Sequence, residues 1–140
     1  MDSTIQVDIV SAEGEIFAGP ARVVFLPATE GEIGVHPRHA PLLTMLKPGE
    51  VRVQTPDGEE HSFYVGGGAL EIQPHKVTVL ADTAARARDL DEAAALAARQ
   101  RAQEALTGRL DKISYAEAQA ELARAAAQLK LIQKLRRIKG

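Results

Sequence analysis

The residue types that the chain uses change part of the way along, and this change limits the folds open to it. All seven prolines lie at or before Pro74, and nine of the eleven glycines lie at or before Gly68. The remainder is rich in Ala, Leu, Arg, Glu and Gln. Proline and glycine favour turns and interrupt helices, whereas alanine is the best helix former. The sequence therefore predicts a β domain at residues 1–86 followed by a helical domain at residues 87–140.

The first domain is predicted to consist of short strands. Apolar and polar residues alternate over residues 5–9, and residues 22–26 form an apolar run typical of a strand buried on both faces. Turns with proline are expected at residues 55–58 and 73–76. The strands that flank them are expected at residues 51–53, 63–65, 70–72 and 77–80. Short strands with turns every eight to twelve residues or so indicate a sandwich or flattened barrel.

The second domain is predicted to be an antiparallel hairpin of two helices. Asp89 is the expected N-cap of the first helix, Ser114 with Glu117 forms a capping box for the second, and Gly108 lies between them. Stripes at alternating spacings of three and four run through Ala95, Ala98, Ala102 and Ala105, and through Tyr115, Ala118, Leu122, Ala125, Leu129 and Ile132. An alanine-lined contact buries little apolar area, so we expect strong helices with a weak interface that can open without melting.

Charge divides the chain in the same way. Residues 1–80 carry eleven acidic and five basic side chains, whereas residues 81–140 carry eight acidic and twelve basic ones. After Glu121 there are six bases and no acid. The basic end, residues 129–140, suits nucleic acid, an anionic membrane, an acidic protein surface, or simply a solvated helix end. It has no aromatic residue to stack on bases or to anchor at a membrane.

Several classes of protein are excluded or disfavoured. Cysteine is absent, so disulfides, thiolate metal ligands and cysteine nucleophiles are impossible. No apolar run reaches the roughly 18 residues of a membrane span, and the N-terminus lacks the features of a signal or transit peptide. We therefore expect a cytoplasmic protein. None of the four serines lies in a GxSxG pattern, which argues against a serine hydrolase.

Residues 31–50 contain three prolines, three glycines and two histidines, an unusual density for a connecting loop. A metal site, a catalytic loop and a rigid surface clamp are the three interpretations. Glu32, His36 and His39 are possible zinc ligands, but no second cluster offers a fourth, so the sequence predicts no metal site. Residues 66–68 are three glycines without the spacing of a phosphate loop, which predicts a close backbone approach or a bulge within a sheet.

One family accounts for both domains. The chain resembles the epsilon subunit of bacterial F-type ATP synthase from end to end. The stretches that carry the resemblance are VSAE at 10–13, GEIG at 31–34, HAPLL at 39–43, KPG at 47–49, GG at 66–67, LEIQP at 70–74, VTVLADT at 77–83, DLDE at 89–92 and AQL at 127–129. The resemblance implies a β-sandwich and a helical hairpin in a non-catalytic subunit of the rotating central stalk, on the cytoplasmic face of the bacterial inner membrane.

The same resemblance implies partners. The sandwich would dock on the gamma subunit and on the rotor c-ring through a loop at residues 31–41. In that loop Gly31, Glu32, His39 and Pro41 match the family, with Glu32 facing the ring and His39 near gamma. The hairpin would extend into the catalytic head and block ATP hydrolysis. Its contacts with an acidic segment of the beta subunit would come from Arg124, Lys130, Lys134, Arg136 and Arg137.

Some bacterial members of this family bind ATP at the folded hairpin, and this chain matches that site only in part. The matching residues are Leu90, Asp91, Arg101 and Arg124, whereas Ala94 and Gln128 stand where the site has arginines. Because these arginines would hydrogen-bond the triphosphate, we expect weak or absent ATP binding and no cofactor. The alternatives are an ATP-sensing module whose hairpin position is set by nucleotide, and a stand-alone enzyme or nucleic-acid binder.

Overall fold

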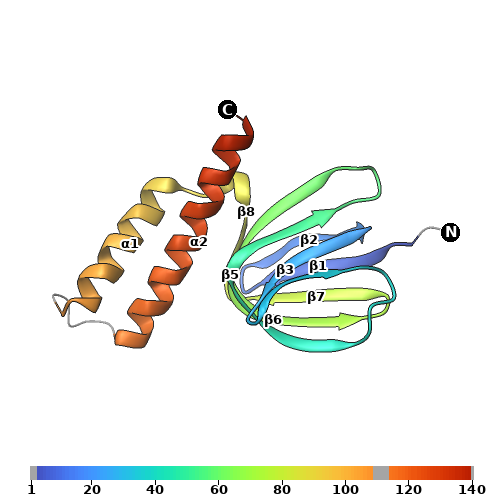
Figure 1. Cartoon of the computed structure of the whole chain (residues 1–140), viewed down its shortest axis with the longest axis horizontal. Helices are drawn as coiled ribbons and strands as arrows, with labels where there is room; N and C mark the ends of the chain where they lie inside the picture. The colour runs from blue at the N-terminus through green and yellow to red at the C-terminus, as the bar shows by residue number, and fades with distance from the viewer. Residues whose placement is uncertain (1–2, 109–113, 140) are drawn as a thin grey trace. The chain divides into compact units, whose positions relative to one another are not determined.

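A computed structural model describes residues 3–108 and 114–139 (Figure 1). The chain divides into two compact units, Met1–Arg86 and Ala87–Gly140. The first contains strands and the second contains helices, so the predicted fold class of a sandwich followed by a helical hairpin is confirmed. Within the described residues, neither α-helix is long and apolar enough to cross a membrane.

Eight strands of the described chain form one strongly bent sheet. They are β1 (Ile5–Ser11), β2 (Gly14–Ala21), β3 (Val23–Ala28), β4 (Gly31–Val35), β5 (Leu42–Gln54), β6 (Glu60–Gln73), β7 (Lys76–Ala81) and β8 (Ala84–Arg86). Their order is β2-β1-β7-β6-β5-β3-β4, and β8 pairs with β6. All neighbours are antiparallel except β1 and β7, which run parallel.

The core of the sandwich is aliphatic, as the near absence of aromatic residues requires. Ile5, Val7 and Ile9 are fully buried, which confirms the alternation predicted for the first strand. Val24 and Leu26 of β3 are also fully buried, whereas Phe25 between them is half-buried on the other face. Each such side chain stabilises the fold by roughly 1.5–3 kcal/mol through removal from water.

The long strands β5 and β6 contribute to both layers of the sandwich because their inward faces switch part of the way along. In β6, Phe63 and Val65 point inward at odd positions, whereas Leu70 and Ile72 point inward at even positions. The three glycines at 66–68 lie at the switch, and Figure 1 shows β5 and β6 curving there. A Cβ on Gly68, whose φ is +138°, would lie 2.2 Å from the carbonyl oxygen of Leu80. The predicted close backbone approach is confirmed.

The expectation of a loop over residues 31–50 is wrong for most of its length. Residues 31–35 form β4 and residues 42–50 belong to β5, so only residues 36–41 connect them. The glycines and prolines misled the interpretation, because β4 is a terminal strand of the sheet, where such residues are tolerated. For the same reason β2, at the other end of the sheet and containing Gly19 and Pro20, gave no clear strand signal.

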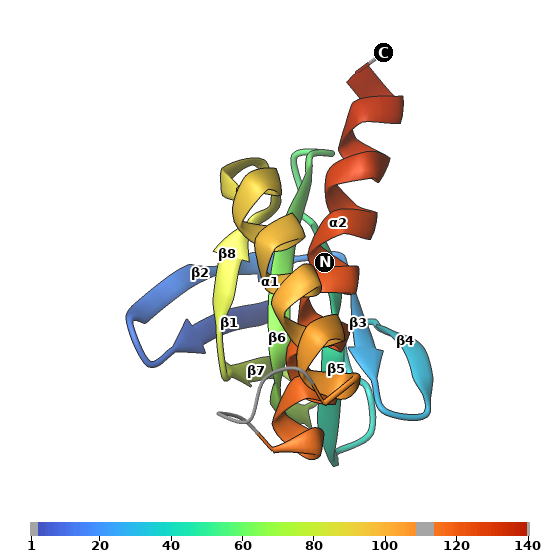
Figure 2. The ribbon, with the colours of Figure 1, turned by 90° about the vertical axis from the view of Figure 1, so that its left-hand side faces the viewer.

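The second unit begins with a short 3-10 turn, η1 (Ala87–Asp89), followed by α1 (Glu92–Leu106) and α2 (Tyr115–Lys139), which run side by side (Figure 2). Asp91, not Asp89, caps α1: its Oδ1 accepts a hydrogen bond from the Ala94 N–H at 3.2 Å. The prediction of Asp89 was wrong because the chain remains in η1 through that residue and becomes extended only at Asp91.

The other predicted ends of the helices are confirmed. Ser114 Oγ accepts a hydrogen bond from the Glu117 N–H at 3.1 Å at the start of α2. Gly108, with a φ of +82°, follows the last turn of α1, and its N–H donates to the carbonyl of Ala105 at 3.1 Å. The left-handed conformation explains why glycine stands at this position.

Small side chains line the contact between α1 and α2. The buried residues of the two helices are Ala95, Ala102, Ala118, Ala125, Leu129 and Leu131; we call the first five the alanine seam. These residues belong to the two predicted stripes, but Tyr115, also assigned to a stripe, is exposed, so that assignment was wrong. Tyr115 is the first residue of α2 and precedes its first buried residue, Ala118, by three positions. Leu129 is the one large side chain of this set, and Leu122 and Ile132 of the predicted stripe are half-buried. The alanines themselves contribute little to closing the hairpin.

Substitution of Gly68 tests the close approach between β6 and β7. Gly68→Ala is expected to lower the free energy of unfolding by more than about 3 kcal/mol, because backbone strain adds to a clash with backbone atoms of β7. Gly58→Ala is the matched control, since Gly58 also has a positive φ but has open space around its Cβ position. It should cost only about 1–2 kcal/mol. Equal losses in urea titrations of the two variants would contradict the packing argument.

Candidate docking and regulatory surfaces

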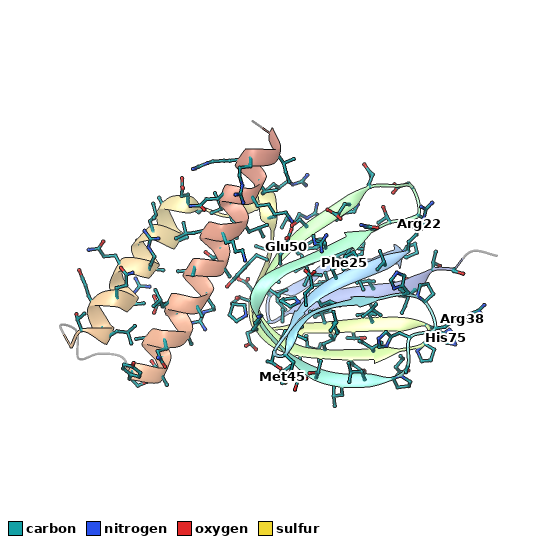
Figure 3. All side chains as sticks on the ribbon, in the orientation of Figure 1. Arg22, Phe25, Arg38, Met45, Glu50 and His75 are labelled. Atoms are coloured by element: carbon teal, nitrogen blue, oxygen red, sulfur yellow. The ribbon has the colours of Figure 1, made fainter. Side chains whose placement is uncertain are left out.

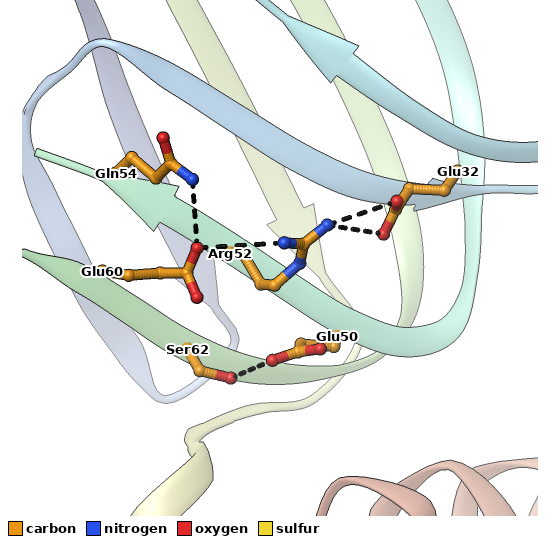
Figure 4. Close-up of polar contacts among 6 residues, drawn as sticks. All are labelled: Glu32, Glu50, Arg52, Gln54, Glu60 and Ser62. Atoms are coloured by element: carbon orange, nitrogen blue, oxygen red, sulfur yellow. Dashed lines mark hydrogen bonds and ion pairs between the residues drawn. The ribbon is translucent and has the colours of Figure 1, made fainter. Parts of the chain in front are cut away.

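The residues predicted to dock on a rotor lie in two different environments. Glu32 projects from β4 onto the outer face of the sheet, where both of its carboxylate oxygens lie 3.3 Å from Nη2 of Arg52 on β5 (Figure 4). Gly31 begins β4, with a φ of +136°. His39 and Pro41 belong to the connection after β4 and share no hydrogen bond with Glu32. The structure therefore shows no direct hydrogen bond that would join Glu32 to this connection.

Arg52 organises the surface around Glu32, and sequence reasoning missed it. Its guanidinium lies 4.3 Å above the ring of Phe25 and also approaches Glu60, with Nη1 3.8 Å from Oε1. Gln54 Nε2 donates a hydrogen bond to Oε1 of Glu60 at 3.2 Å. Because Arg52 is held between two carboxylates and a ring, it fixes the direction of Glu32. The cross-strand spacing of these residues cannot be read from the sequence without the register of β3, β4 and β5.

Hydrogen bonds hold the connection at residues 36–41. Some lie within the connection itself, and one joins it to the turn at residues 73–76. The N–H of Arg38, which has a φ of +68°, donates to the carbonyl of Pro74 at 2.9 Å. Arg38 and His75 accordingly lie at the same end of the sandwich (Figure 3). His39 Nδ1 lies 2.6 Å from the Ala40 carbonyl oxygen, so Nδ1 carries the proton in this hydrogen bond. Among the described residues, no three His, Asp or Glu side chains are arranged to hold a metal ion.

A network of charges also links the strands near this end. Lys76 Nζ lies 3.0 Å from Oδ2 of Asp8, and Gln6 donates to Oδ1 of Asp8 at 2.9 Å. The hydrogen bond from Gln6, followed by the contact with Lys76, lowers the pKa of Asp8. The lowered pKa favours the folded state above the ordinary pKa of an aspartate, and this contribution is lost as the pH falls through the pKa of the folded state.

Large apolar side chains are exposed on the outer face of β5, β6 and β7. Leu43, Met45 and Leu80 retain 75%, 55% and 56% of their accessible surface. Met45 pairs with Ala69, which in turn pairs with Leu80, so these three residues form one row across the strands. We call Met45, Ala69 and Leu80 the outer apolar row. Figure 3 marks Met45 at the surface. The signal was present in the sequence, because Leu42, Leu43, Met45 and Leu46, and likewise residues 79–81, place apolar side chains on both faces of their strands.

The five basic residues predicted to act in inhibition do not form one patch on α2. With about 100° of rotation per residue, Lys130, Lys134 and Arg137 fall within about 60° of one another around the helix. Arg124 and Arg136 lie on other sides. Lys130 and Arg137 are exposed, and Lys134 is half-buried. Arg136 forms an ion pair with Glu92 of α1.

Two of the four residues that match a nucleotide site, Asp91 and Arg101, have side-chain partners within the hairpin. Asp91 caps α1, and Arg101 donates from both Nε and Nη2 to Oε1 of Glu121, with the Nε bond at 3.0 Å. Leu90 and Arg124 are half-buried. Glu121, which faces Arg101 from the opposite helix, was not among the residues predicted from the sequence. A phosphate group at Arg101 would have to displace this carboxylate.

Comparison with known proteins identifies the family. Residues 4–87 match the family described as "ATP synthase, Delta/Epsilon chain, beta-sandwich domain", and residues 88–133 match "ATP synthase, Delta/Epsilon chain, long alpha-helix domain". The ATP synthase epsilon chain of Nitrosococcus oceani is 64% identical over 140 residues, which is the whole of both chains. That of Alkalilimnicola ehrlichii is 64% identical over 135 residues and 96% of each chain.

Solved structures share the fold at low sequence identity. A chain of the Euglena gracilis mitochondrial ATP synthase, in a structure of OSCP, F1 and c-ring, matches with a TM-score of 0.70 and 18% identity, over 100% of this chain and 84% of the other. A chain of the central stalk and c-ring of the Tetrahymena thermophila enzyme matches with a TM-score of 0.60 and 12% identity, over 91% and 96%. With both of its domains matched in order, this chain belongs to the ATP synthase epsilon-chain family, whose members are subunits of the complex and not its catalytic chains.

Proposed function

We propose that the chain couples the rotor c-ring to the gamma subunit in the central stalk of the proton-translocating ATP synthase, and that its C-terminal helices restrain ATP hydrolysis. The matched family and the likeness to central-stalk chains support this assignment. On this proposal the subunit is peripheral, lies on the cytoplasmic face of the bacterial inner membrane, and meets the membrane only through the complex. It has no nucleic-acid partner.

The outer apolar row is the observation that carries the docking function. Met45 and Leu80 are large, exposed and adjacent across the sheet, and contiguous apolar groups of this kind mark protein interfaces. We assign this row, together with Leu43, to the gamma subunit. The connection with His39 and Pro41 belongs to the same docking function.

Glu32 is assigned to the c-ring. Its carboxylate is already oriented by Arg52, which is itself held over Phe25, so little side-chain entropy remains to be lost on binding. Gly31 at the start of β4 positions this strand through a positive φ. A docking residue on a paired strand transmits torque better than one on a free loop, because the strand resists displacement through its hydrogen bonds.

Inhibition is assigned to α2 in an opened hairpin. The weak alanine seam allows α1 and α2 to separate while each stays helical. Lys130, Lys134 and Arg137 then present one basic face to an acidic segment of the beta subunit. Arg124 and Arg136 extend that charge to neighbouring sides of the helix.

Nucleotide sensing is the second candidate, and the contacts within the hairpin argue against it. Ala94 and Gln128 replace two arginines that would bind phosphate, and Glu121 already neutralises Arg101. Asp91 is engaged in capping α1. We therefore assign weak or absent ATP binding to this chain.

Removal of the hairpin tests the inhibitory function. In the assembled complex, a chain truncated after Arg88 is expected to raise ATP hydrolysis several-fold over the full chain, because the helices that would enter the catalytic head are gone. Hydrolysis is measured at equal occupancy of the epsilon chain, verified by gel analysis of the purified complex. An unchanged rate would show that the hairpin does not inhibit and that the subunit acts in coupling alone.

Substitution of the outer apolar row tests the gamma assignment. Met45→Ser with Leu80→Ser is expected to weaken binding to purified gamma subunit by about tenfold or more, since each truncated interface anchor commonly costs more than 1 kcal/mol or so. Both side chains are exposed, so thermal stability should hardly change. Leu96→Ser, an exposed leucine on α1, is the control. Equal affinities for the double variant and the control, in a calorimetric titration, would overturn the assignment.

Restoration of the missing arginines tests the nucleotide argument. The natural chain should show no low-micromolar binding when titrated with ATP, whereas Ala94→Arg with Gln128→Arg should gain roughly tenfold or more in affinity, because hydrogen bonds to charged groups contribute about 1.5–3 kcal/mol each. Ala97→Arg, which adds charge at another exposed position of α1, is the control. A dissociation constant in the low micromolar range for the natural chain would contradict the prediction.

A further inference from the structure

Among the described residues, two ion pairs cross between the helices of the hairpin. Arg101 of α1 binds Glu121 of α2, and Arg136 of α2 binds Glu92 of α1. Each helix therefore supplies one acid and one base, and each base engages an acid of the opposite helix. In the first pair both Nε and Nη2 of Arg101 donate to the same carboxylate oxygen.

The two pairs are placed so that both are broken when the helices separate. Glu92 and Arg101 are nine positions apart in α1, which corresponds to about 13 Å along the helix axis. Ala95 of the alanine seam lies between them along α1, and Ala102 follows Arg101 directly; both alanines are fully buried. Because alanines contribute little apolar burial, the ion pairs carry a larger share of the difference between closed and open hairpin than they would beside a leucine-lined contact.

The arginines of these pairs remain accessible to an outside anion. The side chains of Arg101 and Arg136 retain 59% and 62% of their accessible surface, whereas that of Glu121 retains 20%. An acidic surface can therefore approach either guanidinium before the internal pair has broken. When a carboxylate of the partner takes the place of the internal glutamate, each ion pair that is lost is replaced by a new one. An acidic partner can therefore lower the free-energy cost of opening the hairpin.

We propose that Glu92 and Glu121 hold the hairpin closed as internal competitors of an acidic partner surface, and that opening proceeds by transfer of Arg136 and Arg101 from these glutamates to carboxylates of the partner. The closed state then depends on charge pairing, and salt weakens it. The identification of the beta subunit as this partner rests on the proposed function. The role of the two ion pairs in closing the isolated hairpin does not depend on it.

The absence of cysteine from the sequence permits a direct distance measurement in the full chain. Ala93→Cys on α1 and Gln133→Cys on α2 place spin labels at two exposed positions, near the pair formed by Glu92 and Arg136. Pulsed electron paramagnetic resonance gives the distribution of the distance between the labels. Circular dichroism on the same samples checks that both helices persist.

In this labelled background, Glu92→Gln with Glu121→Gln removes both pairs without a change of side-chain size. Glu104→Gln with Glu117→Gln is the matched control, because it removes the same charge from the same two helices and neither acid pairs across the seam in the described structure. At low salt the ratio of open to closed hairpin should rise about two- to fivefold for each pair lost. In about 1 M salt the unsubstituted chain should approach the double variant, since charges are then screened within about 3 Å.

Identical distance distributions for the test variant, the control and the unsubstituted chain would overturn the proposal. Exchange of the two charges of one pair is a second test. Arg101→Glu alone or Glu121→Arg alone should open the hairpin, and the two substitutions together should close it again. Failure of the combined exchange to restore the closed distance would show that the effect comes from something other than the pair.

Hydrolysis in the assembled complex separates this inference from the proposed function. Glu92→Gln with Glu121→Gln should inhibit hydrolysis more strongly than the matched control, because α2 is released more readily. If this variant opens the isolated hairpin while neither it nor truncation after Arg88 changes hydrolysis, the inhibitory function is wrong and the role of the ion pairs stands. If truncation raises hydrolysis while the variant leaves the hairpin closed, the inhibitory function stands and the proposed role of the ion pairs is wrong.

Discussion

The architecture of the sandwich depends on the contact between the backbone of Gly68 and the carbonyl of Leu80. No other residue type allows β7 to come this close to β6 at a positive φ. The inward face of β6 changes over the glycines at 66–68, so its two halves can serve opposite layers of the core. The same change sets Ala69 on the outer face between Met45 and Leu80. The glycines that close the core therefore also create the outer apolar row.

The two surfaces assigned to docking use different physical means to limit the cost of binding. The outer apolar row gains from the removal of large side chains from water, which acts without a preferred direction. Glu32 contributes an oriented charge. Its partner Arg52 is held by the ring of Phe25 and by Glu60, and so holds the Glu32 carboxylate in one direction. A stalk subunit that must stay attached through rotation benefits from both. Apolar area contributes to affinity, and an oriented charge contributes to register.

The sequence was sufficient where a local rule decides the structure. The alternation of Ile5, Val7 and Ile9, the cap at Ser114 and the glycine at 108 each follow from one stretch of chain. Interactions that depend on pairing were out of reach: Arg52 meets Glu32 only through the register of three strands. Glu121 and Glu92 likewise find their arginines only across the hairpin. The error at Asp89 has the same origin, since two nearby aspartates both suit a cap and the path of η1 selects Asp91.

A hairpin that switches must have closed and open states separated by only a few kcal/mol, because a partner can shift the equilibrium by no more than its difference in affinity for the two. A leucine-lined seam of the same length would bind too tightly for that. Alanine favours stable helices and also a weak contact between them. The equilibrium between the closed and open hairpin then depends more on the ion pairs of Arg101 and Arg136 with their glutamates. Charge pairs suit this role since each can be exchanged for an equivalent pair on a partner. Buried apolar contacts offer no such exchange, so the composition of the hairpin fits a switch set by the charges that surround it.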